Sequence, residues 1–152
     1  MRRKDREIKT RAEIDMILHT AKVMHLALSD DNVPFVVPVF FAYDGEAVYF
    51  HSAREGTKID ILKRNPSVCF EVSLTDGVVE SSSACDFEAR HRTAIGFGTA
   101  SFLEEETGKI AALNRIVARF SEQTFTFPAA NLAATAVVRI AITSIKGKKH
   151  GC

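Results

Sequence analysis

The sequence predicts a mainly β domain, a β-barrel that carries single helices on its periphery. Three observations predict this class. Short alternating apolar segments recur along the chain, polar turn pairs such as Asp44-Gly45 and Asp76-Gly77 separate several of them, and helical periodicity occurs only in isolated stretches. Strands joined by hairpins, with helices placed singly, are typical of a barrel. With 152 residues and 46% apolar content, the chain fits one domain over residues 1–152.

The first predicted element is a helix that begins after Thr10, because Thr10-Arg11-Ala12-Glu13 has the spacing of a capping box. Apolar residues then recur at i, i+3, i+4 and i+7, the spacing that places side chains on one face of a helix. These residues are Ile14, Ile17, Leu18 and Ala21. We expect the helix to pack on the barrel and to close one end of it.

Alternating apolar segments predict the strands that follow this helix. In chain order they are Val23–Ser29, a run from Pro34 to Tyr43, Val48–Ser52, Val68–Leu74 and Val78–Ser82. Turn residues separate them at Asp30-Asp31-Asn32, Asp44-Gly45 and Asp76-Gly77, and the last two pairs predict tight hairpins. Pro38 cannot donate a ladder hydrogen bond, so it indicates an edge strand, a bulge or a place where another group approaches.

Thr93–Leu103 is a long predicted strand on which small residues share one face. Gly96, Gly98 and Ala100 leave that face nearly bare, which allows close approach by a strand, a ring or another subunit, or tight curvature of the barrel itself. No helical pattern follows Gly96-Phe97-Gly98, so these glycines are not a dinucleotide-binding fingerprint. The last predicted elements are a helix with an apolar face of Ile110, Leu113, Val117 and Phe120, and a strand over Thr135–Ile145.

The segment from Val48 to Lys58 turns a predicted strand into a predicted helix, which ends near Asn65-Pro66. Thr57 and Asp60 have the spacing of a capping box, and Lys58 then falls in the first helical turn. Free backbone N–H groups beside Ser52, Arg54 and Lys58 suit a phosphate. The alternative is a solvated loop whose charges carry no function.

Composition excludes several classes of function. The 20 basic and 19 acidic residues give a net charge of +1, so no global field points to nucleic acid. No apolar run approaches the roughly 20 residues of a membrane span, and the charged N-terminus lacks the apolar core of a signal peptide. Cys69, Cys85 and Cys152 are odd in number and widely spaced, which argues against a disulfide framework or a zinc site. We therefore expect a cytoplasmic protein without nucleic-acid or membrane partners and without a bound metal.

The junction Tyr49-Phe50-His51-Ser52-Ala53-Arg54-Glu55-Gly56-Thr57-Lys58 resembles the pyridoxamine-phosphate-oxidase-like flavoproteins, and among them the branch of nitroimidazole-resistance (Nim-type) proteins. The resemblance runs in the same order over nearly the whole chain, through Met1–Ile8, Phe35–Val39, Ala84–Asp86, Arg92–Gly98, Thr135–Ile140 and Gly147–Lys149. It implies an FMN-binding split β-barrel of Greek-key type. It also implies a homodimer that holds the flavin between its protomers.

The resemblance implies a set of cofactor-binding residues, with Lys58 at the flavin phosphate and further contacts from Arg92 and Thr93; which protomer supplies Arg92 is left open. The set is Val37, Pro38, Val39, Phe40, His51, Ser52, Ala53, Lys58, Arg92 and Thr93. FMN is the expected cofactor, with FAD and a deazaflavin left open and NAD(P)H as the electron donor. Phe40 and Phe87 depart from the polar residue and the Trp that relatives often carry, which leaves substrate polarity and ring stacking open.

The resemblance further implies an FMN-dependent oxidoreductase that reduces nitroaromatic (nitroimidazole-like) or other small organic molecules. His51 is the candidate catalytic residue, because a pKa of about 6.5 suits proton delivery. Alternatively, His51 hydrogen-bonds the flavin or the backbone. Two other functions remain open: a flavin-binding or stress-protection protein without turnover, and a haem-binding protein on the same barrel with His51, His91 or His150 as ligand.

Overall fold

Eight strands form one antiparallel sheet with the order β3-β2-β6-β7-β8-β5-β4, and β1 pairs with β8 outside that path. The computed structural model describes residues 3–152, so Met1 and Arg2 of the N-terminal motif lie outside the described residues. The strands are β1 (Glu7–Ile8), β2 (Val23–Asp30), β3 (Val33–Phe40), β4 (Ala42–Tyr43), β5 (Ala47–Ala53), β6 (Ser67–Val79), β7 (Glu88–Phe102) and β8 (Thr135–His150). The mainly β prediction is confirmed.

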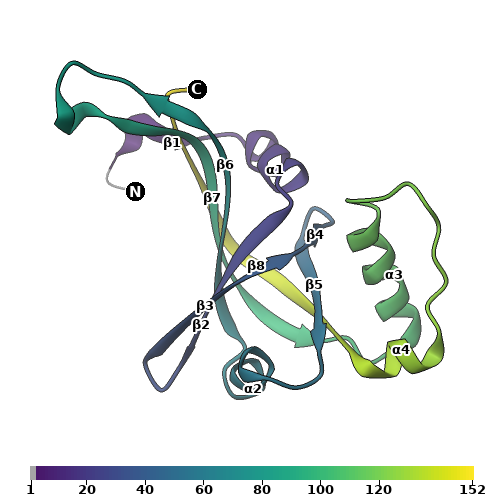
Figure 1. Cartoon of the computed structure of the whole chain (residues 1–152). Helices are drawn as coiled ribbons and strands as arrows, with labels where there is room; N and C mark the ends of the chain where they lie inside the picture. Colours follow the sequence, from purple (N-terminus) through teal and green to yellow (C-terminus); the bar gives the residue numbers. More distant parts are fainter. Residues whose placement is uncertain (1–2) are drawn as a thin grey trace.

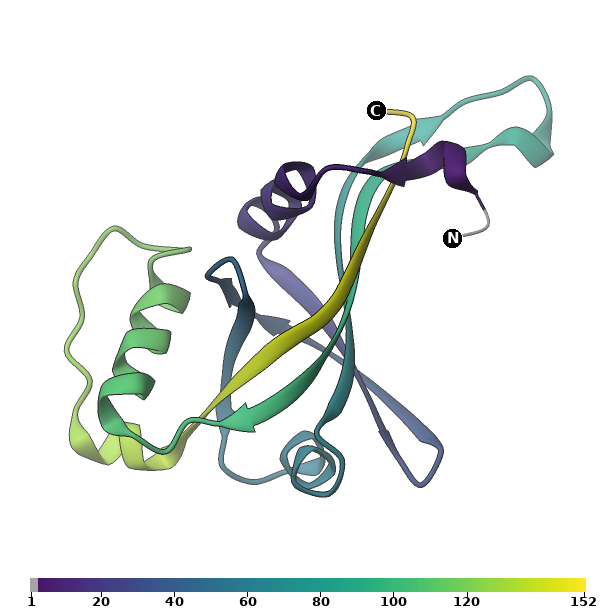
Figure 2. The same cartoon turned by 180° about the vertical axis from the view of Figure 1, so that it is seen from behind.

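Helices cover different parts of this sheet. They are α1 (Arg11–Thr20), α2 (Thr57–Arg64), α3 (Glu106–Val117) and α4 (Ala129–Ala134), with 3₁₀ turns at Lys4–Arg6 and Ala84–Asp86. In Figures 1 and 2, α1 lies near the end of the sheet that holds the C-terminus, α2 lies at the opposite end, and α3 and α4 stand beside β5. Within residues 3–152, none of the helices combines the length and the apolar character needed to cross a membrane.

Helix α1 packs into the main core as predicted. Ile17 and Leu18 are fully buried, Ile14 is nearly so, and all three join the cluster that fills the inside of the sheet. Thr10 is the N-cap residue, but its side chain makes no capping hydrogen bond. Burial of the apolar face therefore holds the helix in place, because it contributes more stabilising free energy than a capping hydrogen bond would.

The run from Pro34 to Tyr43 forms two strands, not one. β3 and β4 lie at opposite ends of the sheet order, and the fully buried Phe41 connects them. Alternation breaks here, because Phe40 is exposed while Phe41 and Ala42 are both buried. β3 is an edge strand paired only with β2, and Pro34 and Pro38 fall at alternate positions where a missing N–H costs no ladder bond.

Asp76-Gly77 does not form the predicted hairpin. β6 continues through both residues to Val79, and its register with β7 shifts between Thr75 and Val78. Gly77 has a φ of 76°, the left-handed conformation that glycine adopts at many bulges. The same sequence pair that favours a turn thus accommodates an irregularity inside a long strand, and the chain reverses only after Val79.

The bare face of β7 accommodates side chains of its own barrel. A Cβ atom at Gly96 would lie 2.2 Å from Cζ of Phe70, which is fully buried on the paired position of β6. A Cβ at Gly98 would lie 2.5 Å from the carbonyl oxygen of Ala141 on β8. Of the predicted alternatives, approach by a ring and by a neighbouring strand are both observed.

Two helical predictions need correction in detail. Helix α2 spans Thr57–Arg64, but Gly56 is its N-cap, so Thr57 and Asp60 do not form a capping box. Helix α3 is present, yet Phe120 lies beyond its end and is exposed, and the buried face is rotated from the predicted one. That face consists of Lys109, Ala112, Leu113 and Ile116. The short helix α4 was not predicted, since Ala129–Ala134 offers too few turns for a periodic pattern.

Candidate functional site

The first turn of α2 is open to an anion. Gly56 caps the helix with a φ of 117°, no side chain hydrogen-bonds to the cap, and nothing lies within 4 Å of where a Cβ would stand at Gly56. The backbone N–H groups of Ile59 and Asp60 donate to the carbonyl of Gly56, whereas those of Thr57 and Lys58 meet no acceptor in the described chain. Such free N–H groups at a helix N-terminus attract negative charge.

Lys58 lies in this first turn, where the helix dipole opposes its positive charge. Its Nζ lies 5.5 Å from the centroid of the Phe50 ring, and no carboxylate within residues 3–152 pairs with it. Burial lowers the pKa of Lys58 below its ordinary value. An anionic group at this turn would compensate both the dipole and the desolvation, so these residues fit a phosphate.

His51 follows Phe50 on β5 and borders a cavity on the side of β5 that faces α3 and α4. This cavity, of about 220 Å³, lies between β5, α3 and α4. Its apolar walls include Leu113, Ile116 and Phe127, and Asn131 and Thr135 supply polar groups. The arrangement suits a small planar molecule with a few polar atoms. The cavity is a feature that the sequence did not indicate, because α3 and α4 reach β5 only through tertiary packing.

The imidazole of His51 is expected to be neutral at neutral pH. Partial burial lowers the pKa of His51 from its ordinary value of 6.5, and the Lys58 ammonium lowers it further. The unfolded chain binds this proton more readily, so His51 contributes stability above about pH 6.5 that is lost as the pH falls through the folded-state pKa. In an NMR titration we expect a midpoint below 6.5 that rises in Lys58→Ala without reaching 6.5. An unchanged midpoint in that variant would contradict the electrostatic contact.

The predicted residues of β3 form a separate hollow. Pro38, Val39 and Phe40 line it together with Val23, and its volume is about 250 Å³. Phe40 is 53% exposed, and its ring stacks in a tilted geometry on Phe120, with centroids 4.6 Å apart. Val37 is half-buried on the same face of the strand as Val39, opposite Pro38 and Phe40. The hollow therefore offers an apolar surface at an open sheet edge.

Within one chain, Arg92 and Thr93 lie far from Lys58 and the first turn of α2. They pair with Lys149 and Lys148 near the C-terminal end of β8, at the end of the sheet opposite α2 (Figure 1). Thr93 Oγ1 shares hydrogen bonds with Ser73 Oγ at 2.9 Å and His91 Nδ1 at 2.8 Å. One protomer therefore does not bring Arg92 to Lys58.

Arg54 does not join Ser52 and Lys58 as the sequence suggested. Its Nη1 donates to the carbonyl oxygen of Ala133 at 3.0 Å, and its Nη2 lies 3.8 Å from Glu104 Oε2. The side chain thus turns from the junction toward α4 and the end of β7. Elsewhere in residues 3–152, no group of three or more His, Cys, Asp or Glu side chains is placed to hold a metal ion.

A sequence model of the family described as pyridoxamine 5'-phosphate oxidase matches residues 10–149. The chain belongs to this family. The match covers the β5–α2 junction, β3, β7 and nearly all of β8, so the resemblance read from the sequence is confirmed.

Solved structures of known proteins share this fold. A proposed 5-nitroimidazole antibiotic resistance protein from Bacteroides thetaiotaomicron is 28% identical, with a TM-score of 0.84 over 93% of this chain and 85% of that one. The flavocytochrome Anf3 from Azotobacter vinelandii is 27% identical, with a TM-score of 0.89 over 100% of this chain and 72% of that one. An FAD and haem binding protein from Mycobacterium smegmatis is 24% identical, with a TM-score of 0.89 over 97% of this chain and 74% of that one. The split-barrel prediction is confirmed.

Among curated proteins, an uncharacterised protein of Rhizobium meliloti (strain 1021) is 29% identical over 66 residues. That segment is 43% of this chain and 43% of the relative, so the chain spans less than half of it.

Proposed function

We propose that the protein is an FMN-dependent oxidoreductase that reduces small organic molecules, such as nitroaromatics, with electrons from NAD(P)H. The observation that carries the proposal is the open first turn of α2, where Lys58 and free backbone N–H groups lack a negative partner in the described chain. The phosphate of FMN supplies that partner. Membership of the pyridoxamine 5'-phosphate oxidase family and the 28% identity to a proposed nitroimidazole resistance protein support the reaction class.

The residues of this chain have separate tasks in the proposal. Lys58 and Ser52 hold the phosphate, while the backbone and side chains of Val37–Phe40 and of His51–Ala53 flank the flavin ring. A bound flavin supplies the hydride and electron transfer, and a cationic wall rich in N–H groups favours its reduction. His51 borders the cavity between β5, α3 and α4, and its lowered pKa makes it a poor proton donor at pH 7. Its neutral imidazole would orient the molecule to be reduced through a hydrogen bond, and the proton that the product needs would come from solvent.

The proposal includes a homodimer, because Arg92 and Thr93 reach the flavin only from a second protomer. The outer face of β7 and β8 supports this assembly, since Ile95 is 44% and Phe97 54% exposed beside a hollow of about 510 Å³ that Thr93 also lines. Exposed apolar residues that gather on one sheet face mark an interaction surface. A second copy of the chain would bury them and complete the site in the same step.

Replacing Phe97 with glutamate should therefore convert the dimer into a monomer. A carboxylate buried without a partner in the interface costs several kcal/mol. Sedimentation velocity at about 10 μM would measure the change, and Val36→Glu is the control, since Val36 is also an exposed apolar residue but lies on β3. If the wild-type chain sediments as a monomer with flavin bound, the shared site is wrong.

The experiment that tests the function is an absorbance titration with FMN and, in parallel, with FAD. We expect saturation at one FMN per protomer with bands near 370 and 450 nm, roughly those of any oxidised flavin. Oxidation of NADH and NADPH is then followed with and without a nitroaromatic acceptor. Flavin binding without oxidation of either nucleotide would favour a flavin-binding protein without turnover, and no flavin binding at micromolar concentration would overturn the proposal.

Haem binding is a second candidate, because the flavocytochrome shares the fold over 100% of this chain. His51 and His91 are the candidate ligands, because Nε2 of His91 has no hydrogen-bond partner in the described chain, whereas Nε2 of His150 pairs with Glu88. A Soret band after haem titration that disappears in His51→Ala would favour this function.

A further inference from the structure

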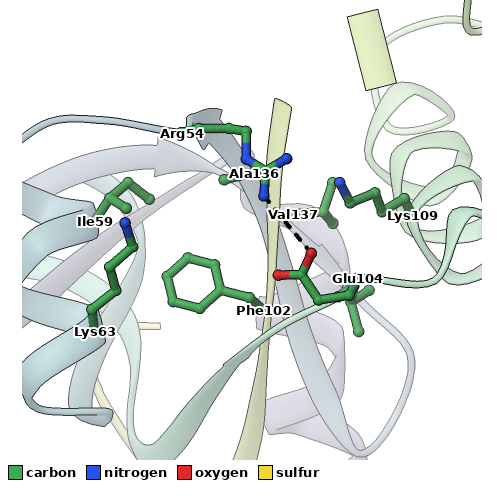
Figure 3. A pocket seen from close by; sticks show the side chains of 9 residues that line it. Arg54, Ile59, Lys63, Phe102, Glu104, Lys109, Ala136 and Val137 are labelled. Carbon is green, nitrogen blue, oxygen red and sulfur yellow. Dashed lines mark ion pairs between the residues drawn. The ribbon is translucent and has the colours of Figure 1, made fainter. Parts of the chain in front are cut away.

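A small pocket lies between the end of β7, the start of β8, helix α2 and helix α3. Its volume is about 100 Å³. The charged and large apolar side chains that line it come from several elements and converge on it (Figure 3); they are Arg54, Ile59, Lys63, Phe102, Glu104 and Lys109. Lys58 and Ser52 do not line this pocket. Ile59 comes from the first turn of α2, but the side chains proposed to hold the flavin phosphate lie outside the pocket.

Lys109 is the unusual residue of the pocket. It is only 7% exposed, although lysine is almost never buried without a partner. Its Nζ donates to the carbonyl oxygens of Leu132 and Thr135, each at 3.3 Å, which is long for a hydrogen bond to an ammonium group. An ammonium has three N–H groups, so these two contacts leave one unused.

Negative charge is scarce around this ammonium. Glu104 is the carboxylate that lines the pocket, and it pairs at 3.8 Å with Arg54. In the described chain no carboxylate lies within 4 Å of Lys109 or Lys63. Three cations thus face one carboxylate, and a charge removed from water without compensation is costly.

A purely structural role for Lys109 accounts for only part of this arrangement. Its two hydrogen bonds to Leu132 and Thr135 connect α3 to the junction of α4 and β8. Any long side chain that ends in a hydrogen-bond donor could make them. They do not explain why the guanidinium of Arg54 and the ammonium of Lys63 border the same hollow, nor why Ile59 and Phe102 leave it unfilled.

We propose that this pocket binds a small oxyanion, a phosphate or a carboxylate, as the counter-ion of Lys109. The anion accepts the free N–H of Lys109 and contacts Lys63 and Arg54, while Ile59 and Phe102 form apolar walls. Such charge-assisted hydrogen bonds are among the strongest in proteins. The site is separate from the one proposed for the flavin phosphate.

The test is thermal unfolding of the full chain at constant ionic strength, titrated with sodium phosphate or sodium acetate in place of sodium chloride. Ligand binding to the folded state raises the midpoint saturably. We expect saturation in the wild type and in Lys9→Met, an exposed lysine that does not line the pocket. In Lys109→Met and Lys63→Met the apparent affinity should fall about tenfold, the effect of one charge-assisted bond. Saturation by phosphate alone identifies a phosphoryl ligand, and saturation by acetate identifies a carboxylate.

Other outcomes would overturn the proposal. A linear, unsaturable response, or equal affinity in Lys63→Met and the wild type, leaves no specific site; Lys63 is exposed, so this arm remains valid if Lys109→Met fails to fold. Loss of anion binding in Lys58→Ala, or displacement of the anion by excess FMN, would place the anion at the first turn of α2 instead. Absence of flavin binding would leave this inference intact, so the two proposals fail separately.

Discussion

Replacing Lys58 with alanine is expected to weaken FMN binding by about 10- to 100-fold. Hydrogen bonds to charged groups contribute roughly 1.5–3 kcal/mol, and 1.4 kcal/mol corresponds to tenfold in affinity. Lys58 has no carboxylate partner in residues 3–152, and its pKa is lowered by burial, so a phosphate gains the full interaction. Quenching of flavin fluorescence on binding gives the two dissociation constants.

The matched control is Lys63→Ala, the same substitution in the last turn of the same helix. It should bind FMN with nearly wild-type affinity. Lys58→Ala should also be at least as stable as the wild type without ligand, because removing a cation from the first turn relieves a dipole conflict of about 0.3–1 kcal/mol. Equal weakening by both substitutions would show that α2 contributes only general positive charge.

Replacing Gly96 with alanine is expected to destabilise the protein by about 3 kcal/mol. The new Cβ would lie 2.2–2.8 Å from three atoms of the Phe70 ring, which is fully buried, so the ring or the backbone of β7 would have to shift within the core. Overpacking of a dense core costs about 1–3 kcal/mol or more. The thermal midpoint should fall by roughly 6–12 °C for a domain of this size.

Gly108→Ala is the control for this substitution. Gly108 lies in helix α3, and nothing stands within 4 Å of its added Cβ, so the change should stabilise the protein by about 1 kcal/mol. A double variant, Gly96→Ala with Phe70→Leu, should be more stable than the sum of its single variants predicts, because a smaller side chain at 70 removes the clash. Additive effects would mean that the ring does not determine the residue at 96.

The sequence determined the fold class and most element positions because their causes are local. Alternation placed β2 and β5, helical spacing placed α1 and the length of α2, and Asp44-Gly45 was correctly assigned to a hairpin. Asp76-Gly77 was assigned wrongly, since positive φ at a glycine serves a bulge as well as a turn. Which of these occurs depends on whether the partner strand continues alongside, and a local pattern does not contain that information.

The sequence also identified the open turn at Lys58 and the family, since both depend on residues that are consecutive in the chain. Lys109 was missed, although a lysine at i with Ala112, Leu113 and Ile116 at i+3, i+4 and i+7 is a recognisable break in an apolar face. Only tertiary structure turned Arg54 toward Glu104, placed α3 and α4 against His51, and separated Arg92 from Lys58. These outcomes depend on contacts between segments far apart in sequence, whose geometry is set by the packing of the whole barrel and not by any local preference.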